Sequence, residues 1–404
     1  MGAGTLIVGA GQGGFEAAES LRSEGYRDAI TLIGDEPHLP YQRPPLSKGF
    51  VLDKQGMDEV ELRPSAFYRD HTIDLLMGER VAAVDRVERR VRLASGGSLP
   101  FESLVLAVGA RNRPLPVDGA TLDGVLYLRT LDESIEIKRR IQAATNVVVV
   151  GGGFIGLELA AVARALGKTV TVLEAQSRLM PRVVAPTISD FYDRLHTAQG
   201  VRIICGAAVC EISGAGGKAQ AVRLSQGESH PADLVLVGIG VIPNIELARD
   251  AGLAVANGVA VDEYLQTGDP DIYAIGDCAE SPNAFTDGRV RLESVQNTVD
   301  QARSVAAAIA GRRAPYAALP WFWTDQFHIR LQMAGLSQGY DRHVTRGNPD
   351  MQKFSVFYFK QDRLIAVDSI NRPADHILAR RLLAAHTPLT PEQAADESID
   401  LRKI

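Results

Sequence analysis

Two glycine-rich stretches, Gly9-Ala10-Gly11-Gln12-Gly13-Gly14 and Gly151-Gly152-Gly153-Phe154-Ile155-Gly156, decide the fold of this 404-residue chain. Each stretch has the pattern G-x-G-x-x-G and follows a short apolar segment, Thr5–Val8 or Asn146–Val150. Each is followed by a segment of helical composition and then by a second β-rich segment. A strand–loop–helix–strand unit therefore occurs twice, about 140 residues apart, and predicts two mononucleotide-binding folds in an α/β protein.

The glycines in these stretches have separate physical roles. The first permits a tight turn, the second lets the backbone approach a pyrophosphate, and the third lets helix and strand pack closely. The helix that follows points its unpaired N–H groups and positive dipole end at the phosphates. The residues expected at the two phosphate sites are Gly9, Gly11, Gly13 and Gly14 in the first loop and Gly151, Gly153, Phe154, Ile155 and Gly156 in the second.

An acidic residue ends the second strand of each unit. Asp35 takes this place in the first unit, with Glu36 as a neighbouring alternative, and Glu174 takes it in the second. A carboxylate there accepts hydrogen bonds from an adenosine ribose and repels a 2′-phosphate. Glu174 therefore predicts a preference for NADH over NADPH, which Arg178 could weaken if it reached the same phosphate; a solvated arginine is the alternative.

Composition narrows the class of protein. Apolar residues make up 46% of the chain and charged residues 23%, an ordinary globular balance. The net charge of −6 argues against nucleic acid as the main partner, and the absence of a long apolar run argues against a membrane span. Three cysteines at uneven spacing indicate a reducing cytoplasm rather than a disulfide scaffold.

Two further patterns favour structural interpretations. Cys205 and Cys210 have the spacing of a redox pair but lie far from the first glycine stretch, where disulfide reductases carry theirs, so we expect structural roles. Cys278 is expected to be a small buried residue. The G-x-S-x-G match at 335–339 lacks a convincing helix after it, and no cysteine or histidine cluster has metal spacing.

Motifs along nearly the whole chain resemble FAD-dependent ferredoxin reductases of the putidaredoxin reductase type, which feed haem monooxygenases or ring-hydroxylating dioxygenases. Besides the glycine stretches, the motifs are Arg43-Pro44-Pro45-Leu46-Ser47-Lys48, Leu106–Gly109, Tyr127–Thr130, Ala274–Asp277, Glu293–Asn297 and Pro320–Trp323. The resemblance implies a glutathione reductase-like fold. Its expected parts are an FAD-binding domain at 1–110 and 240–315, an NAD-binding domain at 111–239 and a C-terminal α+β domain at 316–404.

The resemblance also implies roles for individual residues. Asp35 would bind the FAD ribose, Lys48 would lie by the isoalloxazine ring, and Glu158 would sit near the nicotinamide and flavin, close to Lys48. Lys48 and Glu158 are therefore the expected catalytic residues. The other residues expected to contact coenzyme are Arg43, Val81, Arg129, Asp277 and Val295. Trp321 and Trp323 either form an aromatic platform near the flavin or pack in the C-terminal core, and the sequence leaves both possibilities open.

The resulting hypothesis is an NADH:ferredoxin reductase that holds FAD and passes electrons to an acidic [2Fe–2S] ferredoxin. A net-negative enzyme needs local cations for such a partner, and the candidates are Arg303, Arg312, Arg313 and Arg330. One alternative is an NADH-dependent rubredoxin or small-molecule reductase on the same scaffold. Another is a redox-sensing flavoprotein similar to apoptosis-inducing factor. The tail after Ala384 is polar and is expected to pack loosely.

Overall fold

The structure is a computed structural model that describes residues 3–286 and 288–404. The chain forms two compact units. Unit 1 comprises 1–42, 56–111 and 242–320, and unit 2 comprises 43–55, 112–241 and 321–404. Along the described ranges, no helix has both the length and the apolar composition needed to cross a membrane.

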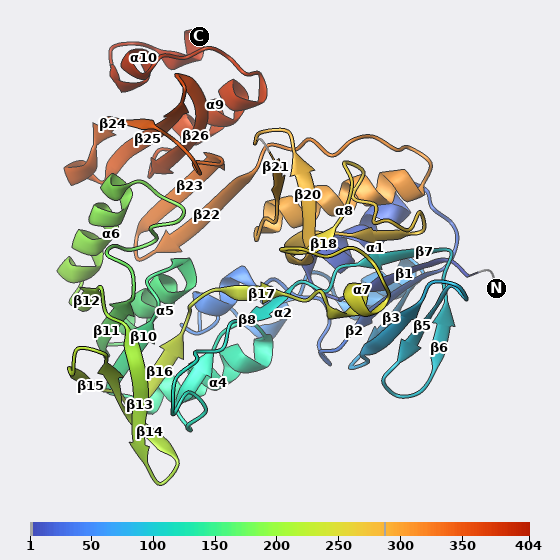
Figure 1. The fold of residues 1–404 in the computed structure, drawn as a ribbon, viewed down its shortest axis with the longest axis horizontal. Coiled ribbons are helices and arrows are strands. Elements are labelled where there is room, and N and C mark those ends of the chain that lie inside the picture. Colours follow the sequence, from blue (N-terminus) through green and yellow to red (C-terminus); the bar gives the residue numbers. More distant parts are fainter. Residues whose placement is uncertain (1–2, 287) are drawn as a thin grey trace. The chain divides into compact units, whose positions relative to one another are not determined.

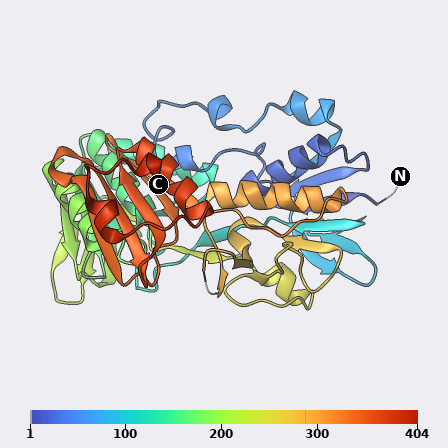
Figure 2. The same ribbon diagram turned by 90° about the horizontal axis from the view of Figure 1, so that it is seen from above.

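Unit 1 is built on a five-stranded sheet in the order β19-β7-β1-β2-β3, in which every neighbouring pair is parallel. Figure 1 labels β1, β2, β3 and β7 of this sheet. Its strands are β1 (Thr5–Val8), β2 (Ile30–Gly34), β3 (Ile73–Met77), β7 (Ser103–Leu106) and β19 (Ile272–Ala274). Parallel strands buried on both faces read as continuous apolar runs, and β1 is buried at every position. Helix α1 (Gln12–Ser23) packs beside α8 (Val295–Ile309), as Figure 2 shows.

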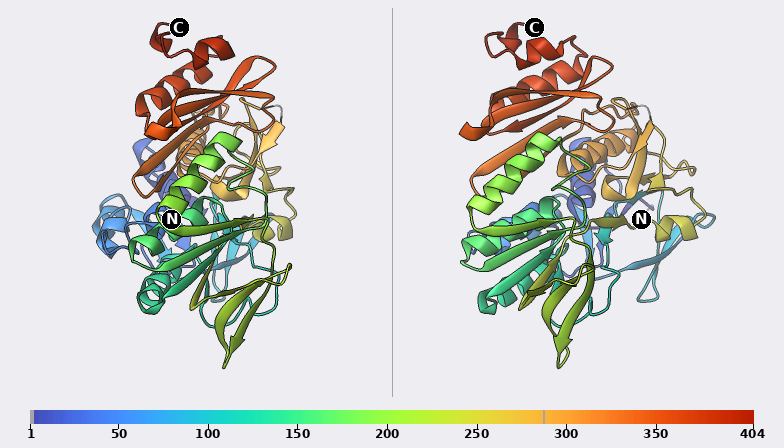
Figure 3. Two further views of the ribbon diagram at one scale, coloured as in Figure 1. Left: turned by 90° about the vertical axis from the view of Figure 1, so that its left-hand side faces the viewer. Right: turned by 60° about the vertical axis from the view of Figure 1, so that its left-hand side comes forward.

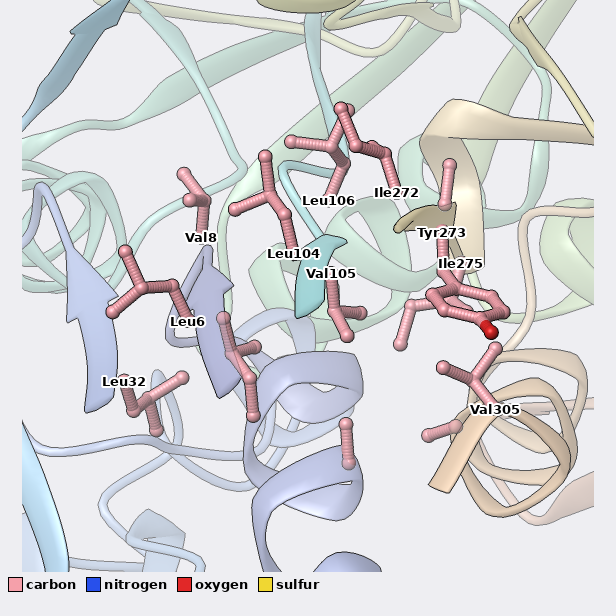
Figure 4. Close-up of a cluster of buried hydrophobic side chains, with 14 of the residues drawn as sticks. Leu6, Val8, Leu32, Leu104, Val105, Leu106, Ile272, Tyr273, Ile275 and Val305 are labelled. Carbon is pink, nitrogen blue, oxygen red and sulfur yellow. The ribbon is translucent and has the colours of Figure 1, made fainter. Parts of the chain in front are cut away.

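The core of unit 1 joins this sheet to α8. Figure 4 shows Leu6 and Val8 from β1, Leu32 from β2, Leu104 to Leu106 from β7, and Val305 from α8. Smaller sheets and short helices complete the unit: α2 (Met57–Val60), α3 (Ser65–Asp70), β4 (Val81–Asp85), β5 (Arg90–Leu93), β6 (Ser98–Pro100), α7 (Glu246–Asp250), β18 (Val259–Ala260), η2 (Gly276–Cys278), β20 (Ala279–Asn283) and β21 (Gly288–Val290). Two short connecting strands are β8 (Ala110–Asn112) and β17 (Val241–Pro243).

Unit 2 repeats the parallel arrangement in the order β12-β11-β10-β16-β9. These strands are β9 (Val125–Tyr127), β10 (Asn146–Val150), β11 (Thr169–Glu174), β12 (Val201–Cys205) and β16 (Leu234–Val237), with helices α4 (Leu131–Ala143), α5 (Phe154–Ala165) and α6 (Pro186–Ala198). An antiparallel sheet of β13 (Val209–Ala215), β14 (Lys218–Leu224) and β15 (Ser229–Pro231) follows, and its hairpin is prominent in Figure 3. The predicted α/β class with two nucleotide-binding folds is confirmed.

The C-terminal part of unit 2 is an antiparallel sheet in the order β22-β23-β26-β25-β24. Its elements are β22 (Trp321–Gln326), β23 (Ile329–Gly335), β24 (Arg342–Asn348), η3 (Pro349–Met351), β25 (Lys353–Lys360), β26 (Arg363–Ile370), α9 (Pro373–Ala384), α10 (Pro391–Ala395) and η4 (Leu401–Lys403). The β25–β26 turn places Gln361 and Asp362 at positive φ, as tight hairpins require. Phe191 of α6 packs on Phe354 of β25 with ring centroids 5.2 Å apart, so the sheet shares its core with the rest of the unit.

The expectation of a loosely packed tail was wrong. Arg346 is 7% exposed, and its guanidinium donates to the backbone carbonyls of Ala394, Asp396 and Ile399. Leu401 is also buried. Polar composition alone did not reveal that one internal arginine satisfies three carbonyls of the tail.

Residues 43–55 belong to unit 2, although they lie within the range 1–110 that the sequence assigned to the FAD-binding domain. This segment contains η1 (Pro44–Ser47), and Ser134 of α4 donates to the carbonyl of Leu46 at 2.8 Å. Val51 is fully buried in the core of unit 2. The three-domain division, with its FAD and NAD assignments, stays a prediction.

Candidate functional site

Both glycine loops turn tightly at their first glycine. Gly9 follows β1 with φ of +108°, and Gly151 follows β10 with φ of +109°. This region of backbone conformation favours glycine because a side chain would clash. The same residue type is therefore required at the same point of both strand–helix connections.

The second glycine of each loop borders open space. A Cβ placed on Gly11 or on Gly153 would meet no heavy atom within 4 Å. These glycines are the N-caps of α1 and α5, and because glycine has no side chain, the cap leaves the N–H groups of the first helical turn without a side-chain acceptor. The N–H groups at each helix start therefore face a place where an anion can approach the backbone, which fits a dinucleotide pyrophosphate.

The third glycine of each loop packs against the turn. A Cβ on Gly14 would lie 1.9 Å from the carbonyl oxygen of Gly9, and one on Gly156 would lie 2.1 Å from that of Gly151. Gly13 is close to α8 instead, because its Cβ would lie 2.9 Å from Cγ2 of Thr298. Turn, open backbone and close packing thus occur in both loops at the three positions that the motif requires.

Glu174 ends β11 and faces the second loop. Its Oε2 accepts the N–H of Gly152 at 2.6 Å, and its Oε1 accepts the N–H of Gln176 at 2.8 Å. A carboxylate has further lone pairs, so it can also accept ribose hydroxyls. Arg178 is half-buried, and its guanidinium donates to the carbonyls of Pro181 and Val184, which hold it within its own loop.

In the first unit Asp35 follows β2 and is exposed. Its neighbour Glu36 is half-buried and accepts the hydroxyl of Tyr41 at 2.5 Å. Of these two carboxylates, Glu36 is thus held by a tyrosine, while Asp35 is the one open to solvent at the strand end. This difference favours Asp35 as the ribose-binding residue.

Lys48 and Glu158 form an ion pair in unit 2, with 2.7 Å between Nζ and Oε2. Glu158 lies on α5 and is 3% exposed, whereas the Lys48 side chain is 24% exposed. Ser47 donates to the same Oε2 at 2.5 Å, and Thr324 donates to Oε1 at 2.6 Å. A buried carboxylate is tolerated when its oxygens are satisfied in this way, so the structure brings together the two residues expected to act as catalytic groups.

Arg43 and Arg129 also meet within unit 2. The guanidinium of Arg43 donates to the backbone carbonyl of Arg129. The N–H of Arg129 in turn donates to Glu133 at 2.6 Å, beside a capping box in which Thr130 starts α4. The Arg43 motif and the Tyr127–Thr130 motif are therefore neighbours in space.

Three of the expected flavin-contact residues lie in unit 1. Val81 is buried at the start of β4. Asp277 is in η2, and Val295 opens α8 after the N-cap Ser294. Gly276 ties η2 to α8, because its N–H donates to Oε1 of Gln301 at 2.7 Å. Asp277 and Val295 thus lie at the same end of α8 that packs on the first glycine loop.

The aromatic residues of β22 are half-buried. Phe322 packs against Phe154 of the second loop, with ring centroids 4.9 Å apart. Trp321 and Trp323 lie 5.6 Å apart, and Trp321 also contacts the ring of His376. Ile155 keeps 44% of its surface exposed, which leaves an apolar side chain at the mouth of the loop.

Comparison with known proteins identifies the family. Residues 4–302 match the pyridine nucleotide-disulphide oxidoreductase family, and residues 321–404 match a reductase C-terminal family. The chain belongs to the pyridine nucleotide-disulphide oxidoreductases. This oxidoreductase is 49% identical to rhodocoxin reductase of Rhodococcus erythropolis, over 98% of this chain and 93% of the relative. It is 43% identical to putidaredoxin reductase CamA of Pseudomonas putida, over 99% and 96%.

Solved structures agree with this assignment. The ferredoxin reductase for the CYP199A2 system from Rhodopseudomonas palustris superimposes with a TM-score of 0.97 at 48% identity, covering 100% of this chain and 99% of the other. Putidaredoxin reductase in its covalent complex with putidaredoxin also gives 0.97, at 42% identity over 99% and 97%. The resemblance to FAD-dependent ferredoxin reductases inferred from motifs is therefore confirmed.

In this oxidoreductase the three cysteines are free. Cys278 is fully buried, and burial raises the pKa of its thiol to about 11, so it remains protonated near neutral pH. Cys205 is half-buried and burial raises its pKa too, whereas Cys210 is exposed. Ser337 of the G-x-S-x-G match donates to a backbone carbonyl, and the next element is the strand β24 rather than a helix. Among the described residues, no group of three or more potential ligands could hold a metal.

The proposed docking arginines all have acidic partners. Arg303 pairs with Glu16, Arg330 with Asp325, and Arg312 and Arg313 pair with Glu24 and Asp262. Exposed ion pairs contribute at most about 1 kcal/mol. A carboxylate of a protein partner could therefore exchange with Asp262 or Asp325 at small cost, whereas Glu16 is buried and losing Arg303 would cost more.

Sequence reasoning missed Ser47 and Thr324 as ligands of the Glu158 carboxylate. Thr324 follows directly after the Pro320–Trp323 motif, and Ser47 directly precedes Lys48. Hydroxyl residues adjoining recognised motifs were the available signal. Their partner lies more than a hundred positions away along the chain, which no local pattern encodes.

Proposed function

We propose that this oxidoreductase transfers electrons from NADH through FAD to an acidic [2Fe–2S] ferredoxin, which serves a haem monooxygenase or dioxygenase. The observation that carries the proposal is the duplicated loop, with its turn, open backbone and close packing at matching glycines. Two such loops in one chain fit two dinucleotides. The relatives named as reductases of rhodocoxin and putidaredoxin supply the class of acceptor.

Each loop has its own set of coenzyme contacts in this proposal. FAD is held by Gly9, Gly11, Gly13, Gly14 and Asp35, with Arg43, Val81, Arg129, Asp277 and Val295 as further contacts. NADH is held by Gly151, Gly153, Phe154, Ile155, Gly156 and Glu174, with Trp323 as an aromatic contact. The exposed Asp35 carboxylate and the Glu174 carboxylate give each adenosine ribose an acceptor.

Lys48 and Glu158 are the groups proposed to act in hydride transfer. Bound flavin supplies the redox chemistry, accepting a hydride from NADH and releasing electrons one at a time. The Lys48 ammonium stabilises the negative charge that the reduced ring gains. Glu158 fixes that ammonium through its 2.7 Å ion pair, and the burial of Glu158 excludes water from the carboxylate side of the pair.

The partner and the cellular location are further parts of the proposal. Arg313 and Arg330 are exposed and pair with partly exposed acids, so they provide cations for an acidic ferredoxin. We place the enzyme in the cytoplasm, where NADH is produced and where free thiols such as Cys210 remain reduced.

The test is a direct acceptor comparison. Purified enzyme with NADH is mixed anaerobically with a [2Fe–2S] ferredoxin or with rubredoxin, and the reduction of each is followed by its own absorbance. Faster ferredoxin reduction supports the proposal. Preferential rubredoxin reduction would favour the second candidate, which a relative named rubredoxin-NAD(+) reductase, 40% identical over 91% of this chain, makes specific. Failure of NADH to reduce the bound flavin would refute both.

A further inference from the structure

A buried chain of hydrogen bonds ends at the Glu158 carboxylate. His196 on α6 contacts Oε1 of Gln326 through its Nε2 at 2.8 Å, and Gln326 Nε2 donates to the hydroxyl of Thr324 at 3.4 Å. Thr324 then donates to Oε1 of Glu158 at 2.6 Å. His196, Gln326 and Thr324 are each at most 1% exposed.

Every donor in this chain points toward Glu158. Burial lowers the pKa of His196, so the ring is neutral near pH 7 and donates from Nε2 to the amide oxygen of Gln326. The amide nitrogen of Gln326 donates to Thr324, which leaves the threonine hydrogen for the carboxylate. Hydrogen bonds aligned in one direction polarise one another in a low-dielectric interior. This series of hydrogen bonds therefore stabilises the negative charge of the Glu158 carboxylate.

The pleat of β22 explains how these residues reach Glu158. Successive side chains of a strand alternate between its faces, so Phe322, Thr324 and Gln326 share one face. Along α5, residues four apart share a side, and Phe322 meets Phe154 while Thr324 meets Glu158. The first strand of the C-terminal sheet thus lies in register with the helix that carries the ion pair.

Three donors hold the carboxylate from two different segments. Ser47 and Lys48 bond Oε2, whereas Thr324 alone, among the described residues, bonds Oε1. Without Thr324, Glu158 could rotate about its terminal bond, and the Lys48 ammonium would follow it. Small displacements of a positioned group slow reactions strongly, by as much as about 10²-fold for about 1 Å.

We propose that Thr324, supported by Gln326 and His196, is a positioning residue that orients the Glu158–Lys48 pair for hydride transfer. This inference rests on the proposed function, because it assigns the pair to the NADH-to-flavin step. It assigns a part in that step to the C-terminal sheet.

The experiment compares Thr324→Val with Thr324→Ser in the full-length, FAD-loaded protein. Val keeps the shape of Thr and removes the hydroxyl, whereas Ser keeps the hydroxyl. We expect Thr324→Val to slow flavin reduction at saturating NADH by about tenfold, with an unchanged dissociation constant for NAD⁺. Thr324→Ser should stay within about twofold of the wild type, because it retains the donor.

Flavin potential provides a readout that does not depend on turnover. Loss of the threonine donor leaves more negative charge on Glu158, which opposes reduction of the flavin. We therefore expect a lower midpoint potential in Thr324→Val and an unchanged one in Thr324→Ser.

Ser355→Ala is the matched control, because Ser355 is a buried hydroxyl on the same sheet that donates to a different carboxylate, Asp375, at 2.9 Å. It should change neither the rate nor the potential. If Thr324→Val does not retain FAD, Gln326→Met carries the test, with an expected slowing of a few fold because Thr324 remains.

Two results would overturn the inference. One is a wild-type rate and potential in Thr324→Val, or in Gln326→Met where that variant carries the test. The other is equal slowing in Ser355→Ala, which would indicate a general effect of damaging the sheet. Wild-type protein whose flavin NADH does not reduce would instead refute the proposed function, so the two failures are distinguishable.

Discussion

In the second glycine loop, alanine at Gly156 should lower stability, whereas alanine at Gly153 should weaken coenzyme binding with little effect on stability. At Gly156 the added Cβ would lie 2.1 Å from the carbonyl oxygen of Gly151, so α5 or the turn must move by roughly 1 Å. Overpacking of this kind costs about 1–3 kcal/mol or more. The gain of about 1 kcal/mol from replacing a helical glycine offsets part of it. Because the 2.1 Å contact is to backbone, we take the upper end of that range, and we expect Gly156→Ala to lower the free energy of unfolding by about 2 kcal/mol.

At Gly153 the added methyl meets no protein atom within 4 Å, and the φ of −83° suits alanine. The free energy of unfolding should change by less than about 1 kcal/mol, the ordinary cost of alanine at an N-cap. The methyl instead occupies the space that a pyrophosphate needs. We expect NAD⁺ to bind at least about tenfold more weakly, which corresponds to about 1.4 kcal/mol, with FAD content unchanged.

Denaturant unfolding and calorimetric titration with NAD⁺ measure the two effects separately. Gly11→Ala is the counterpart in the first loop, and it should lower FAD retention instead. Gly268→Ala is the control, since its Cβ also meets open space but lies outside both loops. Wild-type NAD⁺ affinity in Gly153→Ala, or wild-type stability in Gly156→Ala, would refute the assignment of the three glycine roles.

Three other changes have defined outcomes. Glu174→Arg should lower kcat/KM for NADH and reduce the ratio of kcat/KM for NADH to that for NADPH, with Glu174→Gln as the control. An unchanged ratio would reject the assignment of Glu174 to the ribose. Lys48→Ala should slow flavin reduction by on the order of 10²-fold in stopped flow. A wild-type rate would show that Lys48 has no role in hydride transfer. Burial raises the pKa of Asp368 from 3.8 to about 7, so the folded state retains a proton that the unfolded state releases and stability falls as pH rises through this window. Asp368→Asn should abolish that fall and gain up to about 4 kcal/mol above pH 7, measured by unfolding at several pH values; a pH dependence like that of the wild type would contradict it.

The sequence predicted those parts of the fold that depend on local chemistry. The role of each glycine in the two loops could be predicted from the sequence, because each glycine meets a separate steric requirement. Helix α8 begins at Val295, and the local signal for that start is Ser294, the N-cap whose hydroxyl oxygen accepts the N–H of Asn297. Thr324 and the burial of Arg346 could not be foreseen, because both depend on long-range packing.

The ion pair between Lys48 and Glu158 could be predicted from the sequence only through the family resemblance. Nothing in the local pattern around either residue indicates the other, which lies on a separate helix. Burial of a charged group requires a partner, but that requirement names no residue. The docking arginines illustrate the same point, because their acidic partners became evident only in the structure.

The membership of residues 43–55 in unit 2 limits how this enzyme can be re-engineered. Consider a chimera in which only 112–241 is exchanged for the corresponding segment of an NADPH-specific homologue. Its residue at the position of Glu158 would come from the homologue, whereas Ser47 and Lys48 would come from the original chain. The imported carboxylate would then depend on donors that had not evolved with it. A transplant of coenzyme preference should therefore carry the short 43–55 segment and β22 together with the nucleotide-binding fold.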